Sequence, residues 1–125
     1  MAKVVLLVED DFYIRDLYQL AMERKGFTVI TAVDGQEAID LYGQSHPDIV
    51  LLDIMLPTMS GLEVLKHIKQ LAKDDHDVPV IMITNLDSPE AMERAQNLGA
   101  DDYWVKSLKP PLEVAEAINK YTVDS

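Results

Sequence analysis

Val4-Val5-Leu6-Leu7-Val8 is an unbroken apolar run, and it is the first of three such runs in the chain. The other two are Ile49-Val50-Leu51-Leu52 and Val80-Ile81-Met82-Ile83. Short runs of this kind are typical of strands that are buried on both faces, as in a parallel sheet. Thr28-Val29-Ile30-Thr31 and Tyr103-Trp104-Val105 are strand-like but less apolar. We therefore expect five strands, with the three apolar ones in the centre of the sheet and the two mixed ones at its edges.

The segments between these strands have helical spacing and recognisable ends. Two of them begin with capping-box sequences, Asp34-Gly35-Gln36-Glu37 and Ser60-Gly61-Leu62-Glu63. A third begins with Ser88-Pro89, a cap followed by proline at the first helical position. The apolar spacing predicts buried positions in a first helix that stops at Gly26 and in a last helix from Pro111 to Tyr121: Ile14, Leu17 and Ala21, and Leu112, Ala115 and Ile118.

Strands and helices alternate five times, without a linker, a repeat or a low-complexity segment. This alternation predicts an α/β fold: one doubly wound, flavodoxin-like domain over residues 1–125, with five helices on both faces of a five-stranded parallel sheet. The strand order 2-1-3-4-5 places the three apolar strands in the centre. Ligands of such sheets bind beyond the carboxyl ends of the strands, where the order reverses. Functional residues are therefore expected directly after Val8, Leu52, Ile83 and Val105.

The composition excludes several classes of function. The chain has 125 residues, a formal net charge of −11 and no cysteine. Without cysteine there are no disulfides, no thiolate-bound metals and no thiol nucleophile. The negative charge argues against direct binding of nucleic acid or of an anionic membrane surface, and no apolar run is long enough to span a bilayer. We expect a soluble, cytoplasmic domain.

Acidic residues, a hydroxyl and a lysine stand at the ends of four expected strands. Glu9-Asp10-Asp11 follows the first strand and Asp53 the third, while Thr84 and Lys106 follow the fourth and the fifth. Carboxylates from adjacent strands repel each other unless a cation lies between them, and oxygen ligands without His or Cys favour Mg²⁺. Together with a lysine and a hydroxyl, they predict a site for a phosphoryl group. The alternative is that Asp10 or Asp11 merely caps the first helix.

Several motifs of this chain occur together in one protein family. They are Leu7-Val8-Glu9-Asp10-Asp11, Asp53-Ile54-Met55-Leu56-Pro57, Met59-Ser60-Gly61, Thr84, Gly99-Ala100-Asp101-Asp102-Tyr103 and Lys106. With them the chain resembles the receiver domain of two-component response regulators, the family that includes the chemotaxis response regulator. The resemblance runs from Lys3 to about Tyr121. This family has the strand order 2-1-3-4-5, so the order given above is not an independent expectation.

The resemblance implies a phosphorylation switch that promotes its own phosphotransfer and is not otherwise an enzyme. Asp53 would accept a phosphoryl group from the phosphohistidine of a sensor histidine kinase or a phosphotransfer protein. Asp10 would bind Mg²⁺ directly and Glu9 through metal-bound water, while Asp53 and the backbone carbonyl of Met55 would complete the protein ligands. Lys106 would pair with Asp53 and then with the phosphoryl oxygens.

The resemblance also implies how the signal leaves the site. The Thr84 hydroxyl would move toward the phosphoryl group, and the ring of Tyr103 would turn inward to fill the vacated space. The changed surface would act on a downstream protein or on an output domain that this chain lacks. By family geometry Met55 and Leu86 flank the path of an attacking water, and Asn85 narrows access. Because Met55 and Leu86 are apolar and cannot orient a water, a long-lived phosphorylated state is expected.

The chain departs from the family pattern at three places. Ser107 follows the lysine where the family usually has a proline on a cis bond, so the Lys106-Ser107 bond is either trans or strained. The last helix contains no arginine, which argues against the family's dimerisation through helix 4, strand 5 and helix 5. Lys73-Asp74-Asp75-His76-Asp77 is interpreted as a solvated loop.

Three other functions stay open. A pseudo-receiver would bind partners without phosphorylation, although all the acceptor-site residues are present. An aspartate-nucleophile phosphatase would also use a strand-end carboxylate and Mg²⁺, but it needs a second Asp where this chain has Met55. A flavin-binding protein of the same topology would need hydroxyls and amides in its first loop, where Glu9-Asp10-Asp11 would repel a phosphate.

The remaining polar and aromatic residues are expected to be structural. We expect surface positions for His46, His67 and His76, and core positions for Met82 and Met92. Trp104 should pack on the face of its strand opposite to Tyr103. The tyrosines on helical stripes are Tyr13, Tyr18, Tyr42 and Tyr121.

Overall fold

The computed structural model describes residues 2–72 and 78–122 of the chain. In this part five parallel strands form one sheet in the order β2-β1-β3-β4-β5, which confirms the predicted topology. The predicted solvated loop at 73–77, with His76, lies outside the described residues. The strands are β1 (Val4–Val8), β2 (Thr28–Ala32), β3 (Ile49–Leu52), β4 (Val80–Thr84) and β5 (Asp102–Val105).

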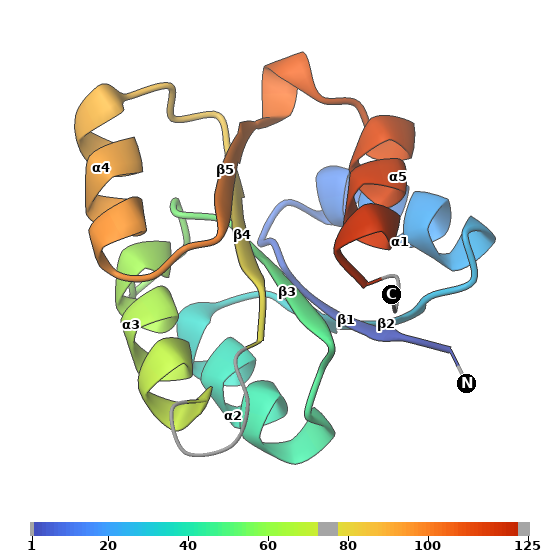
Figure 1. The fold of residues 1–125 in the computed structure, drawn as a ribbon, viewed down its shortest axis with the longest axis horizontal. Helices are drawn as coiled ribbons and strands as arrows, with labels where there is room; N and C mark the ends of the chain where they lie inside the picture. Colours follow the sequence, from blue (N-terminus) through green and yellow to red (C-terminus); the bar gives the residue numbers. More distant parts are fainter. Residues whose placement is uncertain (1, 73–77, 123–125) are drawn as a thin grey trace.

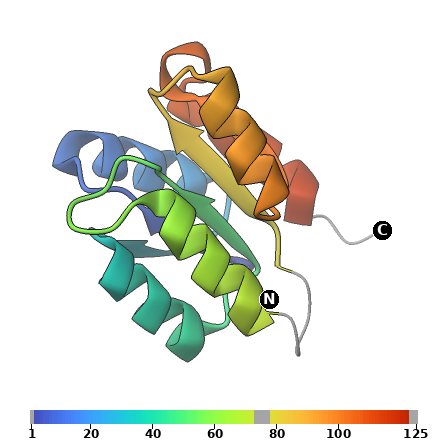
Figure 2. The same ribbon diagram turned by 90° about the vertical axis from the view of Figure 1, so that its left-hand side faces the viewer.

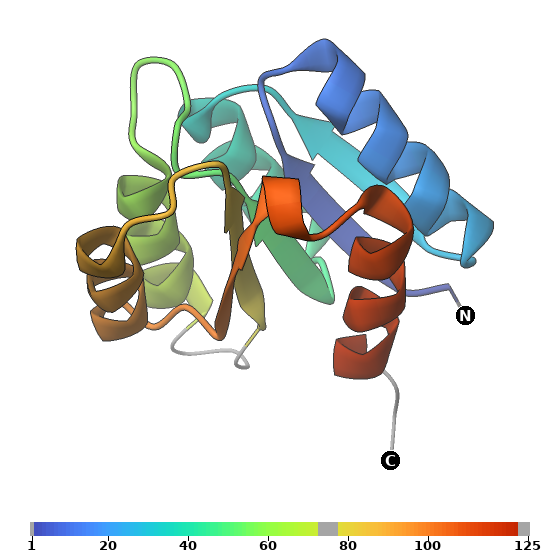
Figure 3. The ribbon, with the colours of Figure 1, turned by 90° about the horizontal axis from the view of Figure 1, so that it is seen from above.

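Two helical layers enclose the sheet (Figures 1 and 3). One layer holds α1 (Phe12–Arg24) and α5 (Pro111–Thr122). The other, which faces the viewer in Figure 2, holds α2 (Gly35–Ser45), α3 (Gly61–Ala72) and α4 (Pro89–Asn97). A short 3-10 helix, η1 (Lys106–Leu108), joins β5 to α5. None of the helices among these described residues is long and apolar enough to cross a membrane.

The core is divided by the sheet into two apolar clusters. Successive side chains of a strand point to opposite faces, so Val5 and Leu7 of β1 pack toward α1 and α5, whereas Leu6 and Val8 pack toward the other three helices. All the β1, β3 and β4 residues from Val5 to Val8, Ile49 to Leu52 and Val80 to Thr84 are buried. The buried centre of the sheet is therefore made of three of the four strands whose carboxyl ends were expected to carry function.

Side-chain caps begin the helices where the sequence predicts them. Asp34 Oδ1 accepts a hydrogen bond of 2.8 Å from the Glu37 N–H. Ser88 Oγ accepts one of 3.2 Å from the Ala91 N–H. Asp11 Oδ1 caps α1 by accepting from the Ile14 N–H at 3.1 Å. The capping interpretation of the first acidic loop thus holds for Asp11, and it leaves Asp10 available for another role.

Several predicted side-chain positions are wrong, although the elements are right. In α1 the buried residues are Tyr18 and Met22, whereas Leu17 is 55% exposed. In α5 Val114 is buried and Leu112 is exposed, and in α4 the core contacts come from Ala91 and Ala95 instead of Met92. Leu17 and Met92 each lie next to a buried residue in the sequence, one step of about 100° around the helix, and Leu112 lies two residues before the buried Val114. Tyr13 and Tyr121, expected to be structural, are exposed, and Tyr121 packs on Trp104 and donates to Asp102 Oδ2 at 3.0 Å.

The remaining structural expectations are confirmed. His46 and His67 are exposed, Met82 is fully buried, and Tyr18 and Tyr42 are core residues. Trp104 packs with α1 and α5, whereas Tyr103 packs against the opposite cluster. The Lys106–Ser107 bond is trans.

Candidate functional site

Glu9, Asp53 and Lys106 follow the carboxyl ends of β1, β3 and β5 and meet at one end of the sheet. Val8 pairs with Leu52 in the register of β1 and β3, so Glu9 and Asp53 leave neighbouring strands at the same level. Together with residues of the adjoining loops they line a cavity of about 250 Å³. The lining residues are Glu9, Asp10, Asp11, Ile14, Asp53, Met55, Asn85 and Lys106.

Lys106 joins two of the acidic residues. Its Nζ atom donates to Asp53 Oδ2 at 2.7 Å and forms an ion pair with Glu9 Oε1. Burial by itself lowers the pKa of Lys106, but the hydrogen bonds to Asp53 and Glu9 and their negative charges outweigh it, so the pKa lies above its ordinary value. Lys106 therefore stays protonated as a fixed positive charge beside Asp53.

Asp53 is held by backbone contacts on three sides. Its N–H donates to the Val8 carbonyl at 3.1 Å, and its Oδ1 accepts from the Met55 N–H at 3.1 Å. Gly61, the first residue of α3, approaches so closely that a Cβ atom there would lie 1.9 Å from the Asp53 carbonyl oxygen. The Gly61 N–H donates to the Ile54 carbonyl at 2.8 Å. The start of α3 thus fixes the backbone that carries Asp53, and only a residue without a Cβ atom can approach this backbone so closely.

The three carboxylates fit a divalent cation. Glu9, Asp10 and Asp53 each offer one oxygen, and these oxygens lie within 4.8 Å of one another. Among the residues that line the cavity, Lys106 is the single cation, and it stands against four acidic residues. Glu9 and Asp53 are buried, whereas Asp10 is exposed and leaves one side open to solvent. Oxygen ligands with an open side are what Mg²⁺ prefers, because it keeps several waters.

Burial shifts the pKa of the Glu9 carboxyl group. Desolvation raises the pKa of Glu9, and the hydrogen bonds from Lys106 and from the Asp11 N–H lower it, with burial the stronger effect. The Asp11 N–H donates to Glu9 Oε2 at 3.1 Å. Both Glu9 oxygens therefore face protein partners.

Thr84 and Tyr103 lie outside this cavity and meet at Leu86. The Thr84 hydroxyl, at the end of β4, accepts a hydrogen bond of 3.2 Å from the Leu86 N–H. The Tyr103 hydroxyl donates to the Leu86 carbonyl. Burial raises the pKa of Tyr103, and the charges of Asp87 and Asp53 raise it further. The backbone of Leu86 therefore links Thr84 to Tyr103, the two residues that the family resemblance implies as a switch pair.

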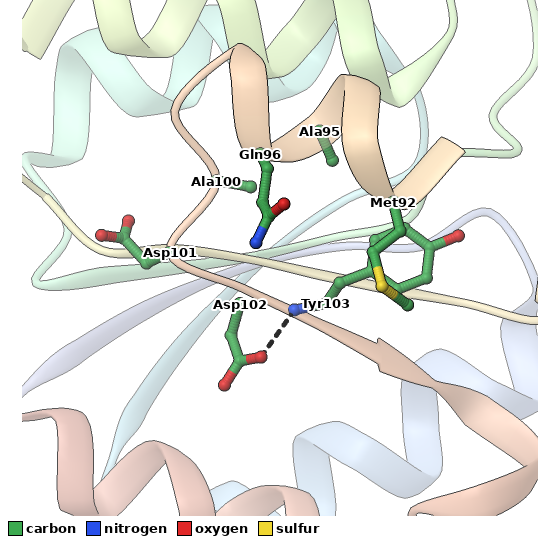
Figure 4. A pocket seen from close by; sticks show the side chains of 7 residues that line it. All are labelled: Met92, Ala95, Gln96, Ala100, Asp101, Asp102 and Tyr103. Atoms are coloured by element: carbon green, nitrogen blue, oxygen red, sulfur yellow. Dashed lines mark hydrogen bonds between the residues drawn. The ribbon is translucent and has the colours of Figure 1, made fainter. Parts of the chain in front are cut away.

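Tyr103 also borders a second, smaller cavity of about 140 Å³ between α4 and β5 (Figure 4). Met92 lies beside Tyr103 there, which explains why this methionine lines a surface cavity instead of the core. The Tyr103 N–H donates to Asp102 Oδ1 at 2.8 Å, so the backbone of β5 is tied down next to the ring.

The amino-acid sequence matches one known protein family over most of its length. A family model described as "Response regulator receiver domain" matches residues 5–119. The chain belongs to the response regulator receiver family. It is thus the receiver domain of a two-component response regulator, a class of signalling switch, and its acidic cluster is compatible with the Mg²⁺ that receivers bind.

Individual relatives agree with this assignment. The receiver is 42% identical over 106 residues to "Probable transcriptional regulator ycf27" of Guillardia theta; the match covers 85% of this chain and 40% of that protein. The chain therefore spans well under half the length of this relative. A CheY-like receiver of Methanospirillum hungatei JF-1 is 30% identical, with a TM-score of 0.88 and coverage of 96% of this chain and 93% of that one.

One similar structure was solved with ligands. It is the CheX-CheY-BeF3-Mg²⁺ complex of Borrelia burgdorferi, with 32% identity, a TM-score of 0.83 and coverage of 98% of this receiver and 90% of that chain. The bound groups belong to that complex.

The sequence pointed to the acidic residues, Asn85 and the lysine of the receiver, but not to Ile14 as a lining residue or to Arg15 as a neighbour of the loop. Arg15 Nη1 donates to the backbone oxygens of Glu9 and Asp10. Its position five residues after Asp10 gives no signal of this contact, because a long flexible side chain on α1 can point in several directions.

Proposed function

We propose that Asp53 is the phosphoacceptor of this receiver and takes its phosphoryl group from a phosphohistidine. The observation that supports it best is the 2.7 Å hydrogen bond from Lys106 Nζ to Asp53 Oδ2, inside a cavity that two further carboxylates share. A fixed ammonium next to a carboxylate nucleophile can neutralise the charge of the arriving phosphoryl oxygens.

In the proposed transfer, an Asp53 carboxylate oxygen attacks phosphorus while the bond between phosphorus and the histidine nitrogen breaks. The bonding electron pair stays with the imidazole, and the new bond joins phosphorus to Asp53. Lys106 then moves its hydrogen bond from the carboxylate to a phosphoryl oxygen. Asp10, Asp53 and the Met55 carbonyl would hold a Mg²⁺ ion, with Glu9 contacting it through water, and the ion would supply further positive charge at this site.

Thr84 and Tyr103 form the proposed switch, coupled through Leu86. When the Thr84 hydroxyl turns to donate to the phosphoryl group, the Leu86 N–H must find another acceptor. The Leu86 carbonyl accepts the hydrogen bond of the Tyr103 hydroxyl, so any shift of the Leu86 backbone is passed to the Tyr103 ring. Tyr103 borders the face between α4 and β5, and the response therefore reaches a surface that a partner can bind.

The phosphodonor in this proposal is a sensor histidine kinase or a phosphotransfer protein. Exposed apolar side chains belong to the segments around the acidic cavity, and a protein donor can cover them during transfer. They are Phe12, Tyr13, Met55, Leu86 and Leu108. Because one relative is named a probable transcriptional regulator, control of transcription, through an attached output domain or a separate protein, is the downstream role that we propose.

The test is to expose the protein to acetyl phosphate and Mg²⁺ and to measure its intact mass. We expect a gain of one phosphoryl group for the wild type and none for Asp53→Ala. Asp16→Ala, which removes an exposed carboxylate of α1 outside the cavity, is the matched control and should gain the group. A wild type that gains nothing would identify a pseudo-receiver, and a gain that persists in Asp53→Ala would mean a different acceptor.

A further inference from the structure

Arg15 reaches back from α1 to the loop that joins β1 to α1. Its Nη1 atom donates to the backbone oxygens of Glu9 and Asp10, at 3.0 Å and 3.3 Å. Its guanidinium carbon lies 5.6 Å from the centre of the Phe12 ring, close enough for a cation–π contact. One half-buried cation thus holds the backbone of two residues that line the acidic cavity.

These hydrogen bonds act on the side of the cluster that Lys106 does not hold. The oxygens of Glu9, Asp10 and Asp53 lie within 4.8 Å of one another, so three ionised groups repel each other. Lys106 offsets this repulsion at Glu9 and Asp53. The carboxylate of Asp10 is exposed, and the backbone of its loop is restrained by Arg15. Without that restraint, repulsion would favour an opening of the loop on this side.

A hydrogen bond to a carbonyl oxygen also fixes the plane of the peptide that contains it. The Glu9 carbonyl belongs to the peptide that leads into Asp10, and the Asp10 carbonyl belongs to the one that leads into Asp11. Their orientation sets the direction in which the Asp10 side chain leaves the backbone. Because a metal site works only when its ligands are held within about 0.5 Å of the productive geometry, these two bonds bear directly on cation binding.

We propose that Arg15 is a positioning residue for divalent cations: its donation to the Glu9 and Asp10 carbonyls holds the acidic loop in the form that binds Mg²⁺. The effect comes from the hydrogen bonds and not from the charge, since a positive charge near the site repels the ion. The biological meaning rests on the proposed phosphotransfer, but the inference itself concerns metal binding and can be tested without phosphate.

The test compares Mg²⁺ affinity in three variants, by following backbone amide NMR signals of residues 9–11 during a titration. Arg15→Ala removes the donors and the charge and should weaken Mg²⁺ binding about tenfold, as loss of a group that orients metal ligands typically does. Arg15→Gln keeps a donor without the charge and should stay within about twofold of the wild type. Arg24→Ala, which removes an exposed cation from the last turn of the same helix, should change nothing.

Two results would overturn the proposal. One is an Arg15→Ala variant that binds Mg²⁺ at least as tightly as the wild type, even if its melting temperature falls, because the role would then be merely structural. The other is an Arg15→Gln variant as weak as Arg15→Ala. If Arg15→Ala does not fold, Arg15→Met, which keeps an apolar stem but has no N–H donor, replaces it, and Mg²⁺ binding at least as tight as that of Arg15→Gln would count against the hydrogen-bond role.

Failure of this inference and failure of the proposed function give different results. A wild type that binds Mg²⁺ more tightly than Arg15→Ala but gains no phosphate refutes the phosphoacceptor proposal and leaves the positioning role in place. A wild type that is phosphorylated while Arg15→Ala keeps full Mg²⁺ affinity refutes only the role of Arg15.

Discussion

Gly61→Ala is expected to destabilise the receiver from a position where alanine is normally favourable. In a helix, alanine is better than glycine by about 1 kcal/mol. At Gly61, however, the new Cβ would lie 1.9 Å from the Asp53 carbonyl oxygen and 2.7 Å from the Ile54 Cα. Real Cβ atoms come no closer than 3.0 Å, so the two backbones must separate by about 1.1 Å. Because both sides of this contact are backbone, no side chain can rotate out of the way.

The expected loss of stability has two contributions. Overpacking of a tight contact costs about 1–3 kcal/mol. The hydrogen bond from the Gly61 N–H to the Ile54 carbonyl is strained as well, and such a bond contributes about 1 kcal/mol. After the gain of about 1 kcal/mol from the helix propensity of alanine is subtracted, we expect the free energy of unfolding to fall by about 1–3 kcal/mol. The displaced backbone also carries Asp53 away from Lys106, so phosphorylation by acetyl phosphate should slow.

Urea unfolding measures the stability, and Gly43→Ala is the matched control. Gly43 lies within α2, and a Cβ there has no heavy atom within 4 Å. This control should therefore be more stable than the wild type by about 0.5–1 kcal/mol. If Gly61→Ala is as stable as Gly43→Ala and is phosphorylated at the wild-type rate, the close approach of α3 to Asp53 does not constrain the site.

Three further predictions concern the acidic cavity. Asp10→Asn should weaken Mg²⁺ binding in a calorimetric titration by about tenfold or more, because it removes a ligand charge; unchanged affinity would exclude Asp10 as a ligand. After phosphorylation and removal of the phosphodonor, the double variant Met55→Asn/Leu86→Glu should lose its phosphate faster than the wild type, because positioning of the attacking water typically accelerates such a step by about 10²–10⁴-fold. Equal decay of the two proteins would show that neither residue controls the lifetime. Burial raises the pKa of Glu9 above its usual 4.5, so the folded protein binds this proton more tightly than the unfolded chain. Stability without metal, measured by thermal unfolding, should therefore fall as the pH rises from below 4.5 through the folded-state pKa of Glu9, and a Glu9→Gln variant that keeps the full slope would contradict this cause.

The strands and the acidic residues could be predicted because their signals are local and strong. An apolar run such as Ile49–Leu52 is buried on both faces whatever its neighbours are, and parallel topology then places the residue that follows it at the carboxyl end of the sheet. For the same reason, the meeting of Glu9, Asp53 and Lys106 follows from strand order alone.

The side-chain errors have a different origin. α1 carries apolar residues around much of its circumference, so spacing alone does not show which of Leu17 and Tyr18 faces the sheet. Packing decides it, and packing depends on α5, which is distant in sequence. The contact of Arg15 with the loop carbonyls was equally out of reach, because a flexible side chain was compatible with several partners.

The lysine of the site has a consequence for how the protein is made. Lys106 lies 53 residues after Asp53 and follows β5, which pairs only with β4 at the edge of the sheet. During synthesis the chain therefore carries Glu9, Asp10 and Asp53 long before their counter-charge exists. An unfinished chain that stops before residue 106 holds Asp53 but not the ammonium beside it. The ion pairs of Lys106 with Glu9 and Asp53 and the completion of the sheet by β5 therefore arise together.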